Sequence, residues 1–161
     1  GWSFRKVSVP VQAWKYGLVT VIAALHDVIL PLGAFALFGK LFGTEIGATF
    51  IAAILTVMGY SINDTIVTLD RIRENVKLNP KQKLGDLINL SINQTLSRTV
   101  LTSLTVFLTV LALYIFGGAV IHDLAFPMLV GVVIGTYSSI YIACTIVLAF
   151  EKMKPSKMKR K

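Results

Sequence analysis

Cysteine is almost absent from this 161-residue sequence, in which Cys144 is the single example. One thiol excludes an internal disulfide and a cysteine-rich metal site, so we expect Cys144 to be a buried packing residue. The two histidines, His26 and His122, are too far apart for a local metal motif, and no glycine-rich phosphate loop is present. Long apolar segments also give a Ser-His-Asp arrangement no aqueous site. The sequence therefore predicts a protein that has no cofactor and is not an enzyme.

Acidic residues are also scarce, with 8 Asp and Glu against 16 Lys and Arg, and the net charge is +8. Such a charge is compatible with nucleic-acid binding, but 55% of the residues are hydrophobic, more than is usual for a soluble domain. Apolar runs of about 18 residues or more indicate membrane-spanning helices. Four such runs divide the chain: residues 17–38, 46–69, 99–116 and 124–150. We therefore expect an all-α membrane protein, a four-helix transmembrane bundle with no nucleic-acid partner.

The cations alternate from one side of these runs to the other. Three Lys or Arg residues precede the first run, one follows it, and six lie between the second and third runs when Arg98 is counted. None lies between the third and fourth runs, and six follow the fourth. Because cytoplasmic loops carry the excess of Lys and Arg, both ends of the chain are predicted to be cytoplasmic, as are a loop at residues 70–98 and the basic tail 151–161. Within 76–98, apolar residues recur at helical spacing, which predicts a helix on the membrane surface or leading into the third run.

Two carboxylates, Asp27 and Asp64, fall inside the apolar runs. A charged group near the centre of the bilayer costs roughly 2.5–3.5 kcal/mol on insertion scales, so such residues suggest function by default. Arg98 opens the third run in the same half of the membrane as Asp64, which makes it a candidate counter-ion. A carboxylate held between apolar surroundings and an arginine can load and release a proton as its neighbour moves. The alternative is a static Asp64–Arg98 pair that only fixes helix packing.

Other polar and small residues give weaker evidence of function than Asp64. His26 and Asp27 form either part of a proton pathway or a satisfied polar pair. Hydroxyl and amide side chains could hydrogen-bond across helices or line a hydrated path; these supporting residues are Ser61, Asn63, Thr65 and Gln94. In the fourth run Gly131, Gly135 and Ser139 recur every four residues, which predicts a smooth face for close packing on another helix. The alternative is that this spacing arises by chance in a glycine-rich apolar segment.

Several strings resemble one family. They are Gly59-Tyr60-Ser61-Ile62-Asn63-Asp64-Thr65-Ile66-Val67, Asp70-Arg71-Ile72-Arg73-Glu74-Asn75, Ala24-Leu25-His26-Asp27-Val28-Ile29, Gln94-Thr95-Leu96-Ser97-Arg98-Thr99 with Leu101-Thr102-Ser103, and residues 131–141. Their order and content are similar to those of the SecF family, which acts with SecD in bacterial protein export and belongs to the resistance-nodulation-division (RND) superfamily.

This resemblance carries expectations that composition does not provide. It implies a six-helix RND-type membrane domain with a periplasmic domain between the first two spans, of which residues 1–161 form the C-terminal transmembrane part. It implies a proton relay at Asp64 with a functional arginine at Arg98, to which we add Asp27. The implied partners are SecD, which is fused to SecF in some chains, the SecYEG translocon, the translocating polypeptide and protons, at the cell inner membrane. The chain begins with Gly1 rather than Met, so we expect a fragment.

Two other functions compete with this one. The first is a proton-driven RND-type exporter of small molecules or lipids, and the second is a scaffold whose charges only orient helices.

Overall fold

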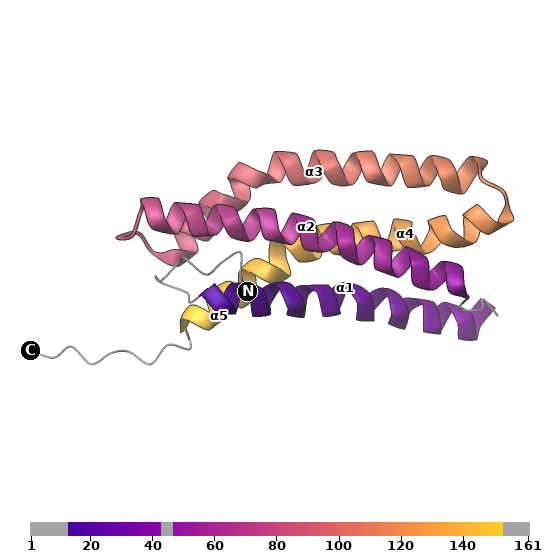
Figure 1. The fold of residues 1–161 in the computed structure, drawn as a ribbon, viewed down its shortest axis with the longest axis horizontal. Helices are drawn as coiled ribbons and strands as arrows, with labels where there is room; N and C mark the ends of the chain where they lie inside the picture. The colour runs from indigo at the N-terminus through magenta and orange to yellow at the C-terminus, as the bar shows by residue number, and fades with distance from the viewer. Residues whose placement is uncertain (1–12, 43–46, 153–161) are drawn as a thin grey trace, which may run out of the picture.

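The computed structural model describes residues 13–42 and 47–152, which form helices joined by short turns (Figure 1). The elements are α1 (Ala13–Phe42), α2 (Ala48–Leu78), α3 (Leu84–Phe116), α4 (Ala119–Tyr137), the π-helical turn η2 (Ser138–Ile142) and α5 (Ala143–Lys152). Four stretches are long and apolar enough to cross a membrane: Trp14–Leu37, Ala48–Leu78, Leu84–Phe116 and Ala119–Phe150. The predicted all-α, four-span fold is therefore confirmed over the described residues.

The segment 70–98 differs from the separate loop that the apolar runs suggested. Helix α2 continues to Leu78 and α3 begins at Leu84, so only residues 79–83 form the turn. The helices persist because polar residues alternate with apolar ones, such as Ile72, Val76 and Leu87, that are buried at helical spacing. The amphipathic stretch thus leads directly into the third span. We call residues 70–98 the basic hairpin.

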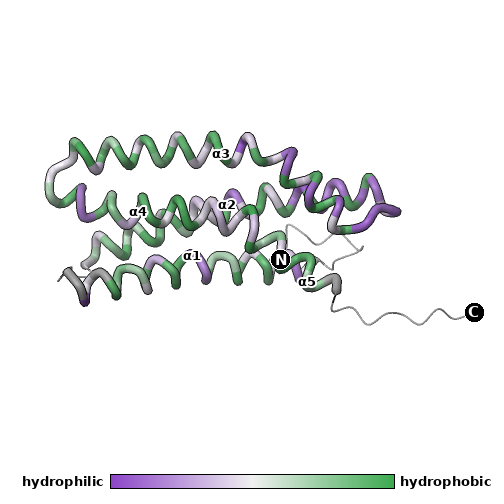
Figure 2. Tube along the Cα trace, turned by 180° about the vertical axis from the view of Figure 1, so that it is seen from behind, coloured by the Kyte–Doolittle hydropathy of each residue, from purple (hydrophilic) through white to green (hydrophobic). Residues whose placement is uncertain are grey.

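The two helices of the basic hairpin are longer than a bilayer requires. Helix α2 has 31 residues, which gives roughly 46 Å at 1.5 Å per residue, whereas the hydrocarbon core is about 30 Å thick. Figure 2 shows hydrophilic residues gathered at the hairpin end of α2 and α3, with apolar residues dominating the rest of both helices. The hairpin therefore projects beyond the apolar layer on one side of the bundle.

Apolar clusters occupy both ends of the bundle. At the hairpin end, residues of α1, α2, α3 and α5 pack together, among them Tyr16, Leu69 and Val147. At the opposite end, where the chain turns at residues 117–118, Phe35, Phe50 and Ile54 form a second buried cluster. Helix α4 packs against α1, α2 and α3, and polar side chains lie between the two clusters.

The fourth span is one continuous helical path with a local change of winding at η2. Figure 1 shows α5 leaving the direction of α4 after this turn, and α5 packs beside the start of α1. Short π-helical turns are rare and often lie at functional sites. Ser138 and Ser139 of η2 are both fully buried, so the turn places two hydroxyl groups inside the bundle.

Candidate functional site

Asp64 lies in the interior of the bundle, on α2 facing α3. The residue is only 6% exposed. Its Oδ1 accepts a hydrogen bond from Thr99 Oγ1 at 3.1 Å, whereas the buried Oδ2 has no hydrogen-bond partner among the described residues. A carboxyl group in this setting can take a proton on Oδ2 without losing the bond from Thr99. The site therefore has the chemistry of a proton carrier.

Arg98 lies next to Thr99 in sequence but points elsewhere. Consecutive residues of a helix are about 100° apart around the axis, and Arg98 is exposed whereas Thr99 is buried. The ion pairs of the described residues include none between Asp64 and Arg98. Arg98 is nevertheless near Asp64, because it is the sequence neighbour of Thr99, which bonds to that carboxylate. The structure thus brings the two residues near each other without forming the static pair.

Asp27 forms a second buried carboxylate site on α1. It is 1% exposed, and its Oδ1 lies 3.0 Å from Nδ1 of His26. Its Oδ2 accepts a hydrogen bond from Ser61 Oγ of α2. Gly135 of α4 also lies beside Asp27, because a Cβ atom added to this glycine would lie 3.9 Å from Asp27 Oδ2. Asp27 is therefore held by groups from three helices.

Two further hydroxyl groups, those of Thr65 and Ser139, lie beside Ser61. Thr65 Oγ1 donates to Ser139 Oγ at 3.1 Å, and Ser139 Oγ lies 3.4 Å from the carbonyl oxygen of Ser61 and 2.8 Å from that of Gly135. These bonds connect α2 with η2 on the side of α2 that faces Asp27. The π-helical turn thus contributes directly to the polar interior.

A second hydroxyl cluster was not among the predicted site residues. Tyr60 OH lies 2.6 Å from Ser103 Oγ, and Thr136 Oγ1 donates to the same Ser103 oxygen at 2.8 Å. This cluster joins α2, α3 and α4 one helical turn from Asp64. All three residues occur in the strings that carry the family resemblance, but nothing in those strings says that they meet. We call these buried and half-buried polar groups of the bundle interior the polar layer: Asp27, Tyr60, Ser61, Asp64, Thr65, Thr99, Ser103, Thr136 and Ser139.

Two of the predicted supporting residues lie outside the polar layer. Asn63 is exposed on α2. Gln94 belongs to the basic hairpin, where its Oε1 accepts hydrogen bonds from Arg71 Nε at 2.7 Å and Asn75 Nδ2 at 2.8 Å. Gln94 therefore ties α2 to α3 at the hairpin end, away from both carboxylates.

The small residues of α4 face α2 closely. A Cβ atom added to Gly131 would lie 2.7 Å from Val57 Cγ1, and one added to Gly135 would lie 3.1 Å from Ser61 Cβ. Gly131, Gly135 and Ser139 are all buried. This close approach of the two helices brings Ser139 within reach of Ser61 and Thr65.

Comparisons with known proteins agree on one family. Residues 7–153 match the family described as "Protein export membrane protein SecD/SecF, C-terminal". The chain is 50% identical to "Protein translocase subunit SecF" of Koribacter versatilis over 86% of its own length and 33% of that protein. It is 48% identical to "Protein translocase subunit SecF" of Thermobaculum terrenum, over 92% of the chain and 46% of the relative.

A solved structure has the same arrangement of helices. It is the crystal structure of SecDF from Thermus thermophilus, described as a translocon-associated membrane protein, with a TM-score of 0.81 and 48% identity. The match covers 88% of this chain and 19% of that one. The chain thus spans less than half the length of these relatives.

Proposed function

The chain belongs to the SecD/SecF C-terminal family of protein export membrane proteins, and we propose that it forms the proton-coupled part of a SecF-like export subunit. In this role proton movement through the bundle assists the translocation of polypeptides. The function is transport rather than catalysis. The observation that carries the proposal is Asp64, a buried carboxylate with one oxygen bonded to Thr99 and the other unpaired among the described residues.

Asp64 is the proton carrier in this proposal. A carboxylate in an apolar bundle is stabilised by the hydroxyl of Thr99 and by nearby positive charge, and protonation removes its charge. Helix packing responds, because a neutral Asp64 no longer attracts Arg98 and can itself donate a hydrogen bond. Movement of α3 relative to α2 is the expected result.

Asp27 is the second member of the relay. Ser61 and Asp64 are three residues apart on α2, which places them about 60° apart around its axis, with Ser61 bonded to Asp27 of α1 and Asp64 bonded to Thr99 of α3. Helix α2 therefore carries both the hydrogen-bond partner of Asp27 and Asp64 itself. In this proposal a proton passes from Asp27 to Asp64 along α2, where the hydroxyl groups of Ser61, Thr65 and Ser139 supply polar groups on the side of Asp27.

Arg98 acts from a surface that the rest of the exporter would cover. An arginine on the lipid-facing side of a span is costly, and Arg98 is exposed in the described segment. Since the chain spans less than half of its SecF relatives, we infer that helices outside this segment, including those of SecD, cover the face that carries Arg98. SecD, SecYEG and a translocating polypeptide are then the partners, at the cell inner membrane with both ends of this segment in the cytoplasm.

Export of small molecules or lipids is the less favoured function, because the matched relatives are named as protein translocase subunits. No feature of the polar layer favours a small substrate over a polypeptide.

Export into inverted membrane vesicles tests the proposal. We expect Asp64→Asn in the full-length protein to insert and bind SecD normally but to lose stimulation by the proton gradient, since the amide keeps the size of the carboxylate but does not titrate. Arg98→Lys keeps the charge but loses the planar guanidinium and should also reduce stimulation. Asn63→Asp is the control: it also changes the charge by one unit, but at an exposed neighbour of Asp64 on α2, and should keep the stimulation. Full gradient stimulation in Asp64→Asn would contradict the assignment.

A further inference from the structure

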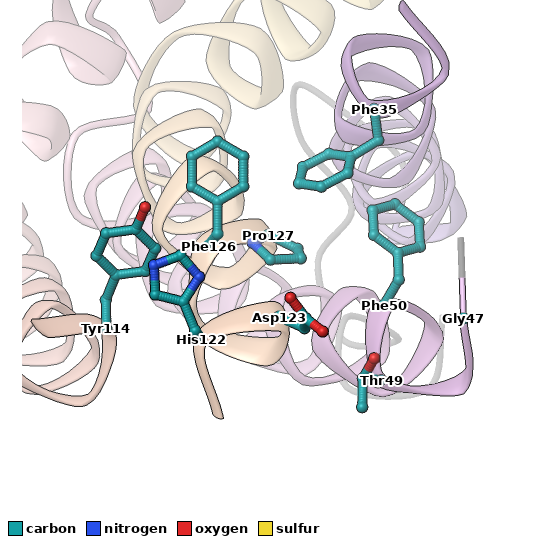
Figure 3. A pocket seen from close by; sticks show the side chains of 9 residues that line it. All are labelled: Phe35, Gly47, Thr49, Phe50, Tyr114, His122, Asp123, Phe126 and Pro127. Atoms are coloured by element: carbon teal, nitrogen blue, oxygen red, sulfur yellow. The ribbon is translucent and has the colours of Figure 1, made fainter. Parts of the chain in front are cut away.

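A cavity of about 580 Å³ lies at the end of the bundle away from the basic hairpin. Figure 3 shows it between the end of α1, the start of α2 and the start of α4. Its polar lining consists of Thr49, Tyr114, His122 and Asp123. The ring of His122 stacks on that of Tyr114, with centroids 3.9 Å apart. By the distribution of Lys and Arg, this end is predicted to face the outside.

The inner side of this cavity is aromatic and apolar. Phe35 of α1 contacts Phe50 of α2 with ring centroids 4.7 Å apart, and it contacts Phe126 of α4 with centroids 5.5 Å apart. Ile54 is buried in the same cluster. Three helices, α1, α2 and α4, thus contribute to one apolar cluster beside the cavity. We call Phe35, Phe50, Ile54 and Phe126 the aromatic plug.

The polar layer begins directly behind the aromatic plug. Val28, which packs against the plug, is the residue after Asp27. Along α1 the distance from Phe35 to Asp27 is roughly 12 Å at 1.5 Å per residue. Asp27 is therefore a buried carboxylate adjacent to the aromatic plug, whose phenylalanines line the cavity.

We propose that the cavity is a hydrated vestibule for proton entry and that the aromatic plug is its gate. This inference rests on the proposed proton-coupled function. The cavity is large enough for several water molecules, each of which needs about 30 Å³ and a few polar partners, and the rim supplies such partners. A narrow apolar constriction excludes water when it is closed, and it lets ions pass when water enters it. When the plug opens, a hydronium ion gives its proton to the Asp27 carboxylate, leaving a water molecule and a neutral carboxyl group.

In this proposal the aromatic plug stays closed except when a proton enters. A continuous water path through the bundle would let protons cross without driving export. Because Phe35, Phe50 and Phe126 come from three different helices, a shift of α4 against α1 and α2 would separate them. Asp64 is proposed to control the packing of α3 on α2, and α4, which carries Phe126, packs against both of these helices and so links that movement to the gate.

Thiol accessibility tests the vestibule and the gate without relying on export. In the full-length protein with its native cysteines replaced, including Cys144→Ala, single cysteines are introduced as Thr49→Cys at the rim and Ser61→Cys behind the plug. A membrane-impermeant, positively charged thiosulfonate is applied from the outer side. We expect rapid modification of Thr49→Cys and protection of Ser61→Cys, which should react fully once the protein is unfolded. Protection of Thr49→Cys, or rapid modification of Ser61→Cys in the closed state, would overturn the inference.

A matched pair of substitutions tests the gate. Ile54→Thr places a hydroxyl group in the plug with little change of shape, and Leu55→Thr places the same group on the neighbouring residue, which is 58% exposed on the outside of α2. In liposomes containing the full-length protein and SecD, Ile54→Thr should raise proton leakage under an imposed potential severalfold, and Leu55→Thr should leave it unchanged. Ile54→Thr should also expose Ser61→Cys to the reagent. Equal leakage in both variants, with Ser61→Cys still protected, would reject the gate.

The two proposals fail in different ways. If proton coupling is wrong, Asp64→Asn exports normally with the gradient while Ile54→Thr still opens Ser61→Cys to water. If only the gate is wrong, Asp64→Asn loses gradient stimulation while Ile54→Thr changes neither leakage nor accessibility. Phe50→Leu, which keeps the plug apolar, provides a second variant should Ile54→Thr fail to insert.

Discussion

Gly131→Ala tests whether the close contact between α4 and α2 is needed for a stable bundle. The added Cβ atom would lie 2.7 Å and 2.8 Å from the two γ carbons of Val57, and 3.1 Å from its Cβ. Valine is β-branched and cannot swing both methyl groups aside within a helix. The backbones of α4 and α2 must therefore separate.

The expected cost follows from overpacking. Forcing one extra carbon into a tightly packed site costs about 1–3 kcal/mol. Gly59→Ala is the matched control, because a Cβ atom there has nothing within 4 Å. That substitution in a helix interior should be neutral or stabilising by up to about 1 kcal/mol. The difference between the two variants isolates the contact with Val57.

Unfolding of the full-length protein in mixed detergent micelles, followed by circular dichroism, measures these free energies. Val57→Ala removes the two γ carbons, so combining it with Gly131→Ala should cost less than the sum of the two single effects by at least about 1 kcal/mol. Equal stability of Gly131→Ala and Gly59→Ala, or strict additivity with Val57→Ala, would refute the reasoning.

Three further outcomes are expected. Thr99→Val removes the hydroxyl donor from Asp64 and should reduce proton-stimulated export in vesicles, whereas Thr102→Val, which removes an exposed hydroxyl bonded only to backbone carbonyls of its own helix, should not. Gly135→Leu should impair assembly with SecD, because the larger side chain forces α4 away from the Asp27 site. Normal co-purification of this variant with SecD would show that close packing at Gly135 is not needed for assembly. A reporter that is active only outside the inner membrane should stay silent when fused after Lys161, and its activity would reverse the proposed topology.

The number of spans could be predicted from the sequence because each requires a long apolar run, and these runs are interrupted by polar segments. The exact ends could not, since a helix does not stop where apolar residues stop. In the basic hairpin, Asn75 bonds to Ser91 and Gln94 across the two helices, and Ile72 and Leu87 are buried. These contacts between the two helices of the hairpin keep both helices intact beyond the apolar runs.

Depth in the membrane could be estimated from the sequence, but rotation around the helix axis could not. Asp64 and Arg98 were expected to meet because they lie at similar depth. Depth alone leaves open which side of α3 faces α2, and the packing turns Thr99 rather than Arg98 toward the carboxylate. Likewise, the hydroxyl groups of Tyr60, Ser103 and Thr136 meet only because three helices converge at one level.

The π-helical turn shows why sequence periodicity misses part of the site. A turn with one extra residue shifts every following side chain around the helix axis, so the faces of α4 and α5 are not continuous. A regular α-helix through residues 138–142 would rotate either Gly131 away from Val57 or Val147 away from the apolar cluster at the hairpin end. With the turn in place, both residues are buried, and Ser139 lies where the two faces meet, hydrogen-bonded to α2. The fourth span thus packs at both ends of the bundle because its winding changes at the level of the polar layer.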